Sequence, residues 1–279
     1  MGAGESGVGA AILAKQKQFN VFVSDASSIK EKYKKLLSEH LITWEENKHT
    51  EENILSADEV IKSPGIPNAN SIIKKIKDKN IPIISEIEFA GRYTNAKKIC
   101  ITGSNGKTTT THLVYHIFKK AGYNIGLAGN VGKSFAMQVA ENNYDFYALE
   151  LSSFQLDDMY AFKADVAIIT NITPDHLDRY EYKLENYVNS KFRIAQNQNK
   201  HNAFIYCADD EVTNKYLGKA NIQAKLYPFS LTQKQEEGAY LDMQTNQIHI
   251  TIHNKQPFTM SIFDLALQGK HNAYNSMAA

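Results

Sequence analysis

Apolar positions along this chain follow two alternating periodicities. Apolar residues spaced three to four apart, with lysines between them, predict amphipathic helices in "IKEKYKKLLSEH" and "NANSIIKKIKDK". Short apolar runs bounded by polar residues, glycine or proline predict strands; they include "NVFVSD", "KKICIT", "NIGLAGN", "DFYALELSS" and "ADVAIITNI". Because strands and helices alternate, we expect an α/β fold with a doubly wound, mostly parallel sheet.

Two domains fit this pattern better than one. A chain of 279 residues is longer than one ordinary core usually holds. The first set of elements ends near "FAGRYTNA", so we expect a Rossmann-like domain at residues 1–95 and a second domain at residues 96–279. Residues 221–263 change character, because "AYLDMQTNQIHITIHN" alternates like a hairpin and predicts antiparallel strands appended to the second sheet.

Composition narrows the class of protein. The formal net charge is only +1, and no apolar run approaches the roughly 18 residues of a membrane span, so we expect neither nucleic acid nor a membrane as a partner. Cys100 and Cys207 each lie in an apolar strand-like run, which favours buried, reduced thiols over a disulfide or a metal pair. This use of cysteine favours a cytoplasmic protein.

The N-terminus allows two interpretations. Gly2 followed by Ser6 matches a myristoylation pattern, which is short enough to recur by chance. Gly2, Gly4 and Gly7 also form G-x-G-x-x-G ahead of a helical pattern, with Asp25 about 20 residues further on, where a ribose contact is expected. We prefer the second interpretation, although the strand that should precede such a turn is missing, which suggests a truncated or misassigned start.

A second glycine-rich turn, "TGSNGKTTT", follows the predicted strand "KKICIT". It is shorter than the standard P-loop, whose spacing would put the first glycine at Ile101. Strand, turn and helix in this order let backbone N–H groups surround phosphate oxygens, while Lys107 would neutralise the outer phosphates and Thr108 would ligate Mg²⁺. The alternative is an ordinary strand-to-helix turn with an incidental lysine.

Three further residues are ambiguous when each is taken alone. Glu150 ends the strand "DFYALE", where α/β sheets place metal ligands, but it could equally be a surface acid. His176 follows "IITNITPD" at another strand end, and a lone histidine is more often structural. Lys191 by itself would be taken for a surface lysine on a helix.

Together the motifs resemble a known family. "TGSNGKTTT", "LELSSFQL", "NITPDHLDRY", "SKFRI" and "GKHNAYNSMAA" occur in the order and approximate spacing of the Mur ligases, the ATP-dependent amino-acid ligases of peptidoglycan synthesis. "LELSSFQL" followed by "DHLDRY" most resembles the branch that adds D-glutamate to UDP-N-acetylmuramoyl-L-alanine. The resemblance covers the whole chain. Compared with the family, the chain lacks the opening strand and stops at "NSMAA", before the C-terminal amino-acid-binding domain.

The resemblance implies roles for individual residues. It implies catalytic roles for Lys107, His176 and Lys191. It implies ATP binding by Gly103, Ser104, Asn105, Gly106, Lys107, Thr108, Thr109, Asn272 and Asn275. It implies two Mg²⁺ ions, held by Thr108, Glu150, His176 and a carbamylated Lys191. It implies substrate binding by Gly4, Glu5, Ser6, Gly7, Asp25, Gly65, Asn130 and His176.

The resemblance also implies a reaction. The L-alanine carboxylate of the UDP-sugar would attack the γ-phosphate of ATP, and the amine of D-glutamate would then displace phosphate from the acyl phosphate. We expect a monomer, and we expect this chain alone to bind its ligands without ligating them. Two alternatives remain: another ligase of the superfamily, such as a folylpolyglutamate synthase, and a non-catalytic nucleotide-binding module.

Overall fold

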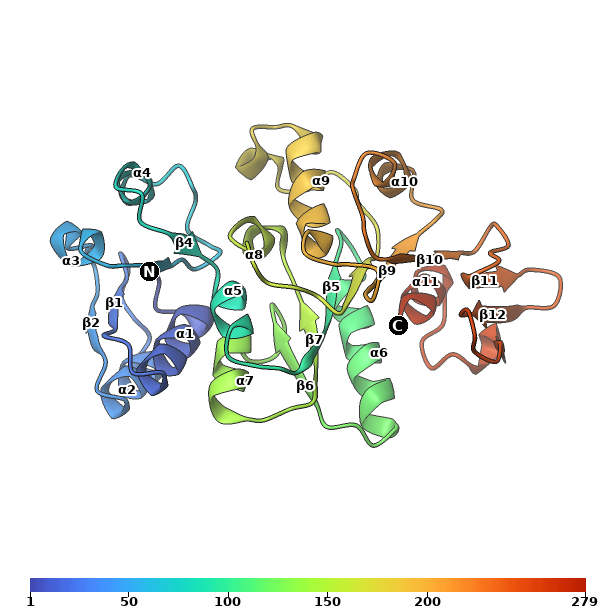
Figure 1. Ribbon diagram of the computed structural model, residues 1–279, viewed down its shortest axis with the longest axis horizontal. Helices are drawn as coiled ribbons and strands as arrows, with labels where there is room; N and C mark the ends of the chain where they lie inside the picture. Colours follow the sequence, from blue (N-terminus) through green and yellow to red (C-terminus); the bar gives the residue numbers. More distant parts are fainter. The chain divides into compact units, whose positions relative to one another are not determined.

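The structure is a computed structural model that describes residues 1–279, and the chain divides into two units, shown in Figure 1. Unit 1 consists of Met1–Asn95, Ala128–Asn143 and Phe154–Phe162. Unit 2 consists of Ala96–Leu127, Tyr144–Ser153 and Lys163–Ala279. Neither unit is continuous in sequence, because two segments between residues 128 and 162 join the first.

Unit 1 alternates short strands with helices, as the sequence predicts. Its first 95 residues contain α1 (Glu5–Gln16), β1 (Phe22–Ser24), α2 (Glu31–Glu39), β2 (Thr43–Glu45), α3 (Glu51–Leu55), β3 (Val60–Ile61), α4 (Ser71–Asp78), β4 (Ile83–Ile84) and α5 (Glu86–Gly91). The two later segments contribute α7 (Phe135–Glu141) and most of α8 (Ser153–Asp157). β1 pairs in parallel with β2, and β3 pairs in parallel with β4.

The first two residues join these two small sheets. Gly2 N–H donates to the carbonyl of Ser24 at the end of β1 (2.9 Å). The amino group of Met1 donates to Ile61 in β3 (2.7 Å), and the N–H of Ser63 donates back to Met1 (3.0 Å). The glycine-rich turn is therefore anchored to the strand ends of both sheets.

Helix α1 forms the centre of unit 1. All seven of its residues from Val8 to Ala14 are buried, so the helix is covered on every side rather than along one stripe. It packs against α2, α5 and α7, and α7 lies alongside it in Figure 1.

Unit 2 is built on a nine-stranded sheet with the order β13-β12-β11-β10-β9-β8-β5-β7-β6. The strands are β5 (Lys97–Thr102), β6 (Ile125–Gly129), β7 (Phe146–Glu150), β8 (Val166–Ile169), β9 (Ala203–Cys207), β10 (Lys225–Ser230), β11 (Gly238–Asp242), β12 (Gln247–Thr251) and β13 (Phe258–Ser261). The helices are α6 (Lys107–Lys120), α9 (Leu184–Phe192), α10 (Glu211–Leu217) and α11 (Lys270–Ala278), with short 3₁₀ turns at Leu177–Tyr180, Arg193–Ala195 and Ile262–Asp264.

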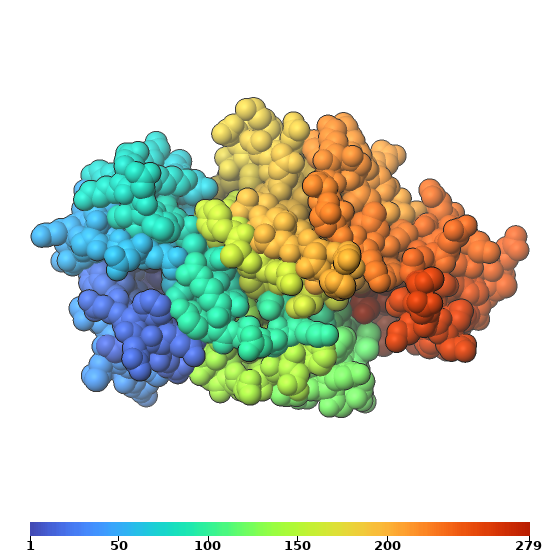
Figure 2. Space-filling view, in the orientation of Figure 1, coloured from blue at the N-terminus to red at the C-terminus, as the bar shows by residue number.

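The mostly parallel sheet with appended antiparallel strands is confirmed. The β5–β7, β5–β8, β8–β9 and β9–β10 pairs are parallel, whereas β11–β12 and β12–β13 are antiparallel. β10 lies in the region where the hairpin pattern was found, yet it is parallel to both of its neighbours. In the space-filling view the C-terminal part of unit 2 forms an orange-to-red surface (Figure 2).

The strand order determines where a site can form. β5 lies between β7 and β8, so the chain passes from one side of β5 to the other after β7. Loops that follow strands on either side of such a switch point diverge and leave a crevice beyond the carboxyl ends of the strands. The loops after β5, β7 and β8 meet this condition, and each contains residues that the sequence singles out.

Candidate functional site

The glycine-rich loop between β5 and α6 requires its first and last glycines. Gly103 has a φ of +147°, and a Cβ there would lie 2.0 Å from Oγ1 of Thr170. Gly106 has a φ of +82°, and a Cβ there would lie 2.3 Å from Oδ1 of Asn275. A side chain at either position would have to displace Thr170 or Asn275, so the loop packs closely against the residue that follows β8 and against α11.

The segment after β8 holds the loop in place. Ser104 N–H donates to the carbonyl of Asn171 (2.9 Å), and Asn105 N–H donates to the Asn171 side chain (3.0 Å). The Ser104 hydroxyl donates to the carbonyl of Thr173 (2.8 Å). Because the first N–H groups of a helix have no intrahelical acceptors, α6 presents its N-terminal donors and its positive dipole end beside a fixed loop. This arrangement suits an anion such as phosphate.

Lys107 is the first residue of α6 and reaches back over the loop. Its ammonium donates to the carbonyl of Ser104 (2.9 Å). Burial lowers the pKa of Lys107, while the nearby Glu150 and Asp175 carboxylates act in the opposite direction. An ammonium that is partly removed from water and beside a phosphate-binding loop can neutralise phosphate charge at low desolvation cost.

Thr108 and Glu150 form a pair of oxygen ligands. The Thr108 hydroxyl donates to Oε2 of Glu150 at 2.7 Å, and Glu150 is 2% exposed at the end of β7. No group of three or more His, Cys, Asp or Glu side chains gathers in an arrangement that could hold a metal. A hydroxyl and one carboxylate suit Mg²⁺, which usually takes one or two protein carboxylates and completes its shell with phosphate oxygens and water. The residues present therefore fit one Mg²⁺ bound together with a nucleotide.

Lys191 lies behind the loop. It is 2% exposed, its ammonium donates to the carbonyl of Gly103 (2.7 Å), and it lies 4.6 Å from the ring centroid of Tyr187. An ammonium is a donor with no lone pair, so Lys191 in this form cannot ligate a cation. Lys191 could therefore help to hold a second metal only after this side chain is modified.

His176 is placed differently from Lys191. It adopts the left-handed conformation, with a φ of +49°. Its side chain is 55% exposed, and Nε2 lies 3.5 Å from Oδ2 of Asp175. Sequence reasoning did not single out Asp175, although an acid directly before His176, in the loop that follows β8, is a detectable signal.

The predicted adenine residues lie on α11, which packs against α6. Asn275 is 7% exposed; its amide accepts from the Thr110 hydroxyl (3.4 Å) and donates to Asn272 (3.3 Å). The Tyr274 hydroxyl donates to Asp209, which follows β9 (2.8 Å). Asp209 was also missed, because only the folded chain brings its strand end to α11.

The predicted substrate residues divide between the units. His176 belongs to unit 2, and unit 1 contains Gly4, Glu5, Ser6, Gly7, Asp25, Gly65 and Asn130. Asp25 accepts from the N–H groups of Ala3 (2.6 Å) and Ser27 (2.8 Å), so it stabilises the glycine-rich turn. Glu5 accepts from the Tyr33 hydroxyl (2.9 Å).

Sequence profiles of two protein domains match the chain. The sequence profile described as "Mur ligase middle domain" matches residues 101–279, and the profile described as "MurD N-terminal domain" matches residues 2–72. The chain belongs to the Mur ligase family.

The curated relatives that the chain resembles share one enzyme name. The chain is 60% identical over 279 residues to the UDP-N-acetylmuramoylalanine--D-glutamate ligase of Bacteroides fragilis, covering 100% of this chain and 62% of that protein. The enzyme of the same name from Bacteroides thetaiotaomicron is 59% identical, and that from Chlorobium phaeobacteroides is 36% identical, with the same two coverages. The chain thus spans less than two thirds of the length of these relatives.

Solved structures share the fold at low sequence identity. UDP-N-acetylmuramate:L-alanyl-gamma-D-glutamyl-meso-diaminopimelate ligase from Neisseria meningitides matches with a TM-score of 0.64 at 17% identity, covering 99% of this chain and 88% of that one. UDP-N-acetylmuramate-alanine ligase from Thermotoga maritima matches with a TM-score of 0.56 at 20% identity, covering 99% and 62%. No helix of the chain combines the length and apolar character that crossing a membrane would need.

Proposed function

We propose that the protein joins D-glutamate to UDP-N-acetylmuramoyl-L-alanine at the expense of ATP, in cytoplasmic synthesis of the peptidoglycan precursor. The observation that carries this proposal is the Thr108–Glu150 pair beside the glycine-rich loop, at the switch point of a parallel sheet. The named relatives at 59–60% identity support the choice of D-glutamate and of the UDP-sugar.

The first step is phosphoryl transfer. A carboxylate oxygen of the L-alanyl group bonds to the γ-phosphorus of ATP as the bond to the ADP oxygen breaks, which yields an acyl phosphate. Both reactants are anions and repel each other, so charge neutralisation dominates the barrier. Lys107 and the N-terminus of α6 would supply it on the phosphate side. Mg²⁺ held by Thr108 and Glu150 would reduce the remaining repulsion.

The second step forms the amide. The amine of D-glutamate attacks the acyl carbon, phosphate leaves with the bonding electrons, and the nitrogen loses a proton. A carboxylate is a poor electrophile until phosphate becomes the leaving group, so one ATP is consumed for each amide bond. We assign His176 and Asn130 to the sugar-peptide substrate, and Asn272 and Asn275 to adenine.

Lys191 would act only after modification. Reaction of its neutral amine with CO₂ gives a carbamate, which replaces an ammonium with an anionic oxygen donor suited to a second Mg²⁺ shared with Glu150 and His176. The buried position of Lys191 against the phosphate-binding loop supports this assignment. We assign the binding of D-glutamate to the part of the relatives that this chain does not span, and we propose that the protein is a monomer.

Phosphate release by the full-length parent protein tests the function. We expect release only when ATP, UDP-N-acetylmuramoyl-L-alanine and D-glutamate are all present. Release with another amino acid or with a folate would keep the mechanism but assign the protein to a different ligase. No release with any acceptor, despite ATP binding, would favour a nucleotide-binding module without catalysis.

Two matched variants connect this activity to the loop. Lys107→Met should lower kcat by at least about 100-fold, because it removes a charge that acts on the transferring phosphate. Lys119→Met removes a lysine from the last turn of the same helix and should leave kcat unchanged. Equal effects of the two substitutions would contradict the assignment.

A further inference from the structure

Helix α5 carries two buried acids, Glu86 and Glu88, whose carboxylates accept hydrogen bonds from other segments of the chain rather than from the helix itself. Ser85 caps α5 by accepting from the N–H of Glu88 (3.1 Å), which is one half of a capping box. In a complete box, the Glu88 carboxylate would accept from the N–H of Ser85, but that N–H donates to the carbonyl of Asp158 (2.8 Å). The Glu88 carboxylate is therefore available for a partner elsewhere.

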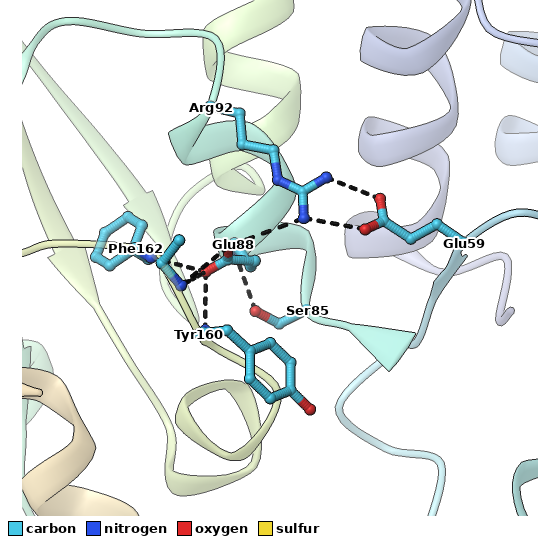
Figure 3. Close-up of polar contacts among 7 residues, drawn as sticks. Glu59, Ser85, Glu88, Arg92, Tyr160 and Phe162 are labelled. Carbon is cyan, nitrogen blue, oxygen red and sulfur yellow. Dashed lines mark hydrogen bonds and ion pairs between the residues drawn. The ribbon is translucent and has the colours of Figure 1, made fainter. Parts of the chain in front are cut away.

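Glu88 binds three consecutive backbone N–H groups instead. Oε2 accepts from Tyr160 (3.0 Å) and Phe162 (2.8 Å), and Ala161 donates to both carboxylate oxygens (3.2 and 3.1 Å). Glu88 is only 2% exposed. Figure 3 shows the carboxylate between this backbone segment and the guanidinium of Arg92, which lies 3.9 Å away. A carboxylate is the only side chain with enough acceptor sites to satisfy all three donors together.

Glu86 does the same for the other inserted segment. Its oxygens accept from the N–H groups of Phe135 (3.2 Å) and Ala136 (2.8 Å) at the start of α7, and it is 1% exposed. Burial is the largest influence on Glu86 and raises its pKa to about 7, while these two hydrogen bonds act in the opposite direction.

A buried ion pair adds a third connection. The Lys62 ammonium lies 2.9 Å from Oδ2 of Asp158, with both side chains below 10% exposed. Lys62 also donates to the carbonyl of Ile66 (3.1 Å), in the loop that carries Gly65. The turn that follows α8 is thus connected both to α5 and to the loop after β3.

These contacts hold in place the two segments of unit 1 that come from after residue 127 of the chain. Ala128–Asn143 contains Asn130, and Phe154–Phe162 follows directly after the strand and turn that carry Glu150. A buried charge is seldom more stabilising than apolar packing of the same volume, so stability alone is a poor explanation for three buried carboxylates. They do specify one conformation, because each acceptor is satisfied by only one placement of the backbone.

We infer that α5 is a clasp whose acids, Glu86 and Glu88, are positioning residues for the sugar-nucleotide site. They hold the two inserted segments of unit 1, so that Asn130 and, through Asp158 and Lys62, the loop that carries Gly65 meet the substrate in a fixed geometry. This inference rests on the proposed function. Small displacements of such groups cost binding and rate even when the chemistry lies elsewhere.

The test compares Glu88→Gln with Glu59→Gln in the full-length parent protein. Glutamine keeps one acceptor oxygen but turns an NH₂ group toward the backbone N–H donors, so at least one of them loses its partner. We expect the KM for UDP-N-acetylmuramoyl-L-alanine to rise about tenfold while the KM for ATP changes less than about twofold. Glu59 pairs with Arg92 at the surface (2.9 Å), and its substitution should leave both values unchanged.

Two additional measurements make the result decisive. Hydrogen exchange at residues 160–162 should accelerate in Glu88→Gln. If Glu88→Gln does not fold, Glu88→Asp replaces it: this variant keeps the charge but is shorter by one methylene, and its KM for the UDP-sugar should rise by less than about tenfold while its KM for ATP stays unchanged. Unchanged KM values, or equal increases for both substrates, would overturn the clasp. No turnover by the unaltered protein would instead overturn the proposed function. In that case the affinity for UDP, measured by calorimetry on the unaltered protein and on Glu88→Gln, would still test the role of Glu88.

Discussion

At the scale of single residues, the loop after β5 depends on the absence of side chains. Gly106 combines a left-handed backbone with close contact to Asn275, whereas Gly122, which ends α6, has nearly the same φ (+84°) with nothing within 4 Å of the position of a Cβ. Because these two glycines flank the same helix, comparing them distinguishes the cost of a left-handed backbone from the cost of a steric contact.

Alanine substitution at these two glycines should therefore have different effects. Gly122→Ala should cost about 1–2 kcal/mol of stability, the usual penalty of a left-handed non-glycine residue. Gly106→Ala should cost more, because the Asn275 side chain must also shift away from the loop, and it should weaken ATP binding at least about tenfold. Thermal unfolding and calorimetry with ATP check this. Equal losses of stability and unchanged ATP affinity would show that the contact with Asn275 is unimportant.

At the scale of elements, acids with buried or partly buried side chains connect segments that lie far apart in the sequence. Glu86 holds the start of α7. Asp209 holds the end of β10 through Ser230 (2.6 Å) and the middle of α11 through Tyr274 (2.8 Å). Their pKa values move in opposite directions, so they affect stability over different ranges of pH.

Glu86 should lower stability as the pH rises. Its folded-state pKa of about 7 exceeds the value of about 4.3 in an unfolded chain, so the folded state binds the extra proton and loses stability between these two values. Glu86→Gln removes this titration and should gain stability relative to the unaltered protein between pH 5 and pH 8. Urea unfolding at several pH values measures the difference. A constant difference across that range would contradict the expectation.

Asp209 should act in the opposite direction. Burial pushes its pKa upward, but hydrogen bonds from Ser230, Thr232, Leu231 and Tyr274 together outweigh burial and lower it. Its contribution is present above the unfolded pKa of about 3.9 and is lost as the pH falls through the lower folded pKa. Asp209→Asn should thus be destabilising at pH 7 and progressively less so below pH 4. Asp264→Asn, at an exposed acid, serves as the control in the same unfolding assay.

At the scale of the whole molecule, the two kinds of ligand are assigned to different units. All the predicted ATP residues belong to unit 2, and all the predicted sugar-nucleotide residues except His176 belong to unit 1. The chain passes between the units several times. Because the two sets of predicted residues nevertheless lie in different units, each unit should respond to its own ligand.

Hydrogen exchange can test this division in the full-length parent protein. ATP with Mg²⁺ should slow exchange in residues 103–109 and leave residues 1–7 unchanged, because only the first set surrounds the phosphate site. UDP should produce the reverse pattern. Protection of residues 103–109 by UDP alone would contradict the division of ligands between the units.

Local patterns in the sequence determined the kind of elements and the candidate loop. The alternation of strands and helices and the appended antiparallel strands follow from the spacing of apolar and polar residues that are near neighbours in the sequence. The functional roles of Lys107, Thr108, Glu150, His176 and Lys191 remain predictions, although the contact of Thr108 with Glu150 supports two of them.

Only the tertiary structure decided which distant segments meet. It placed two pieces of the later sequence with the first 95 residues, and it turned Glu88 toward Tyr160–Phe162, Asp209 toward Tyr274 and Lys191 toward Gly103. Most of these partners are backbone groups, which every residue carries. The pattern of side chains in the sequence therefore cannot predict which of them a given carboxylate or ammonium will contact. A buried carboxylate or ammonium must find such partners, and their identity depends on how the chain packs rather than on its local sequence.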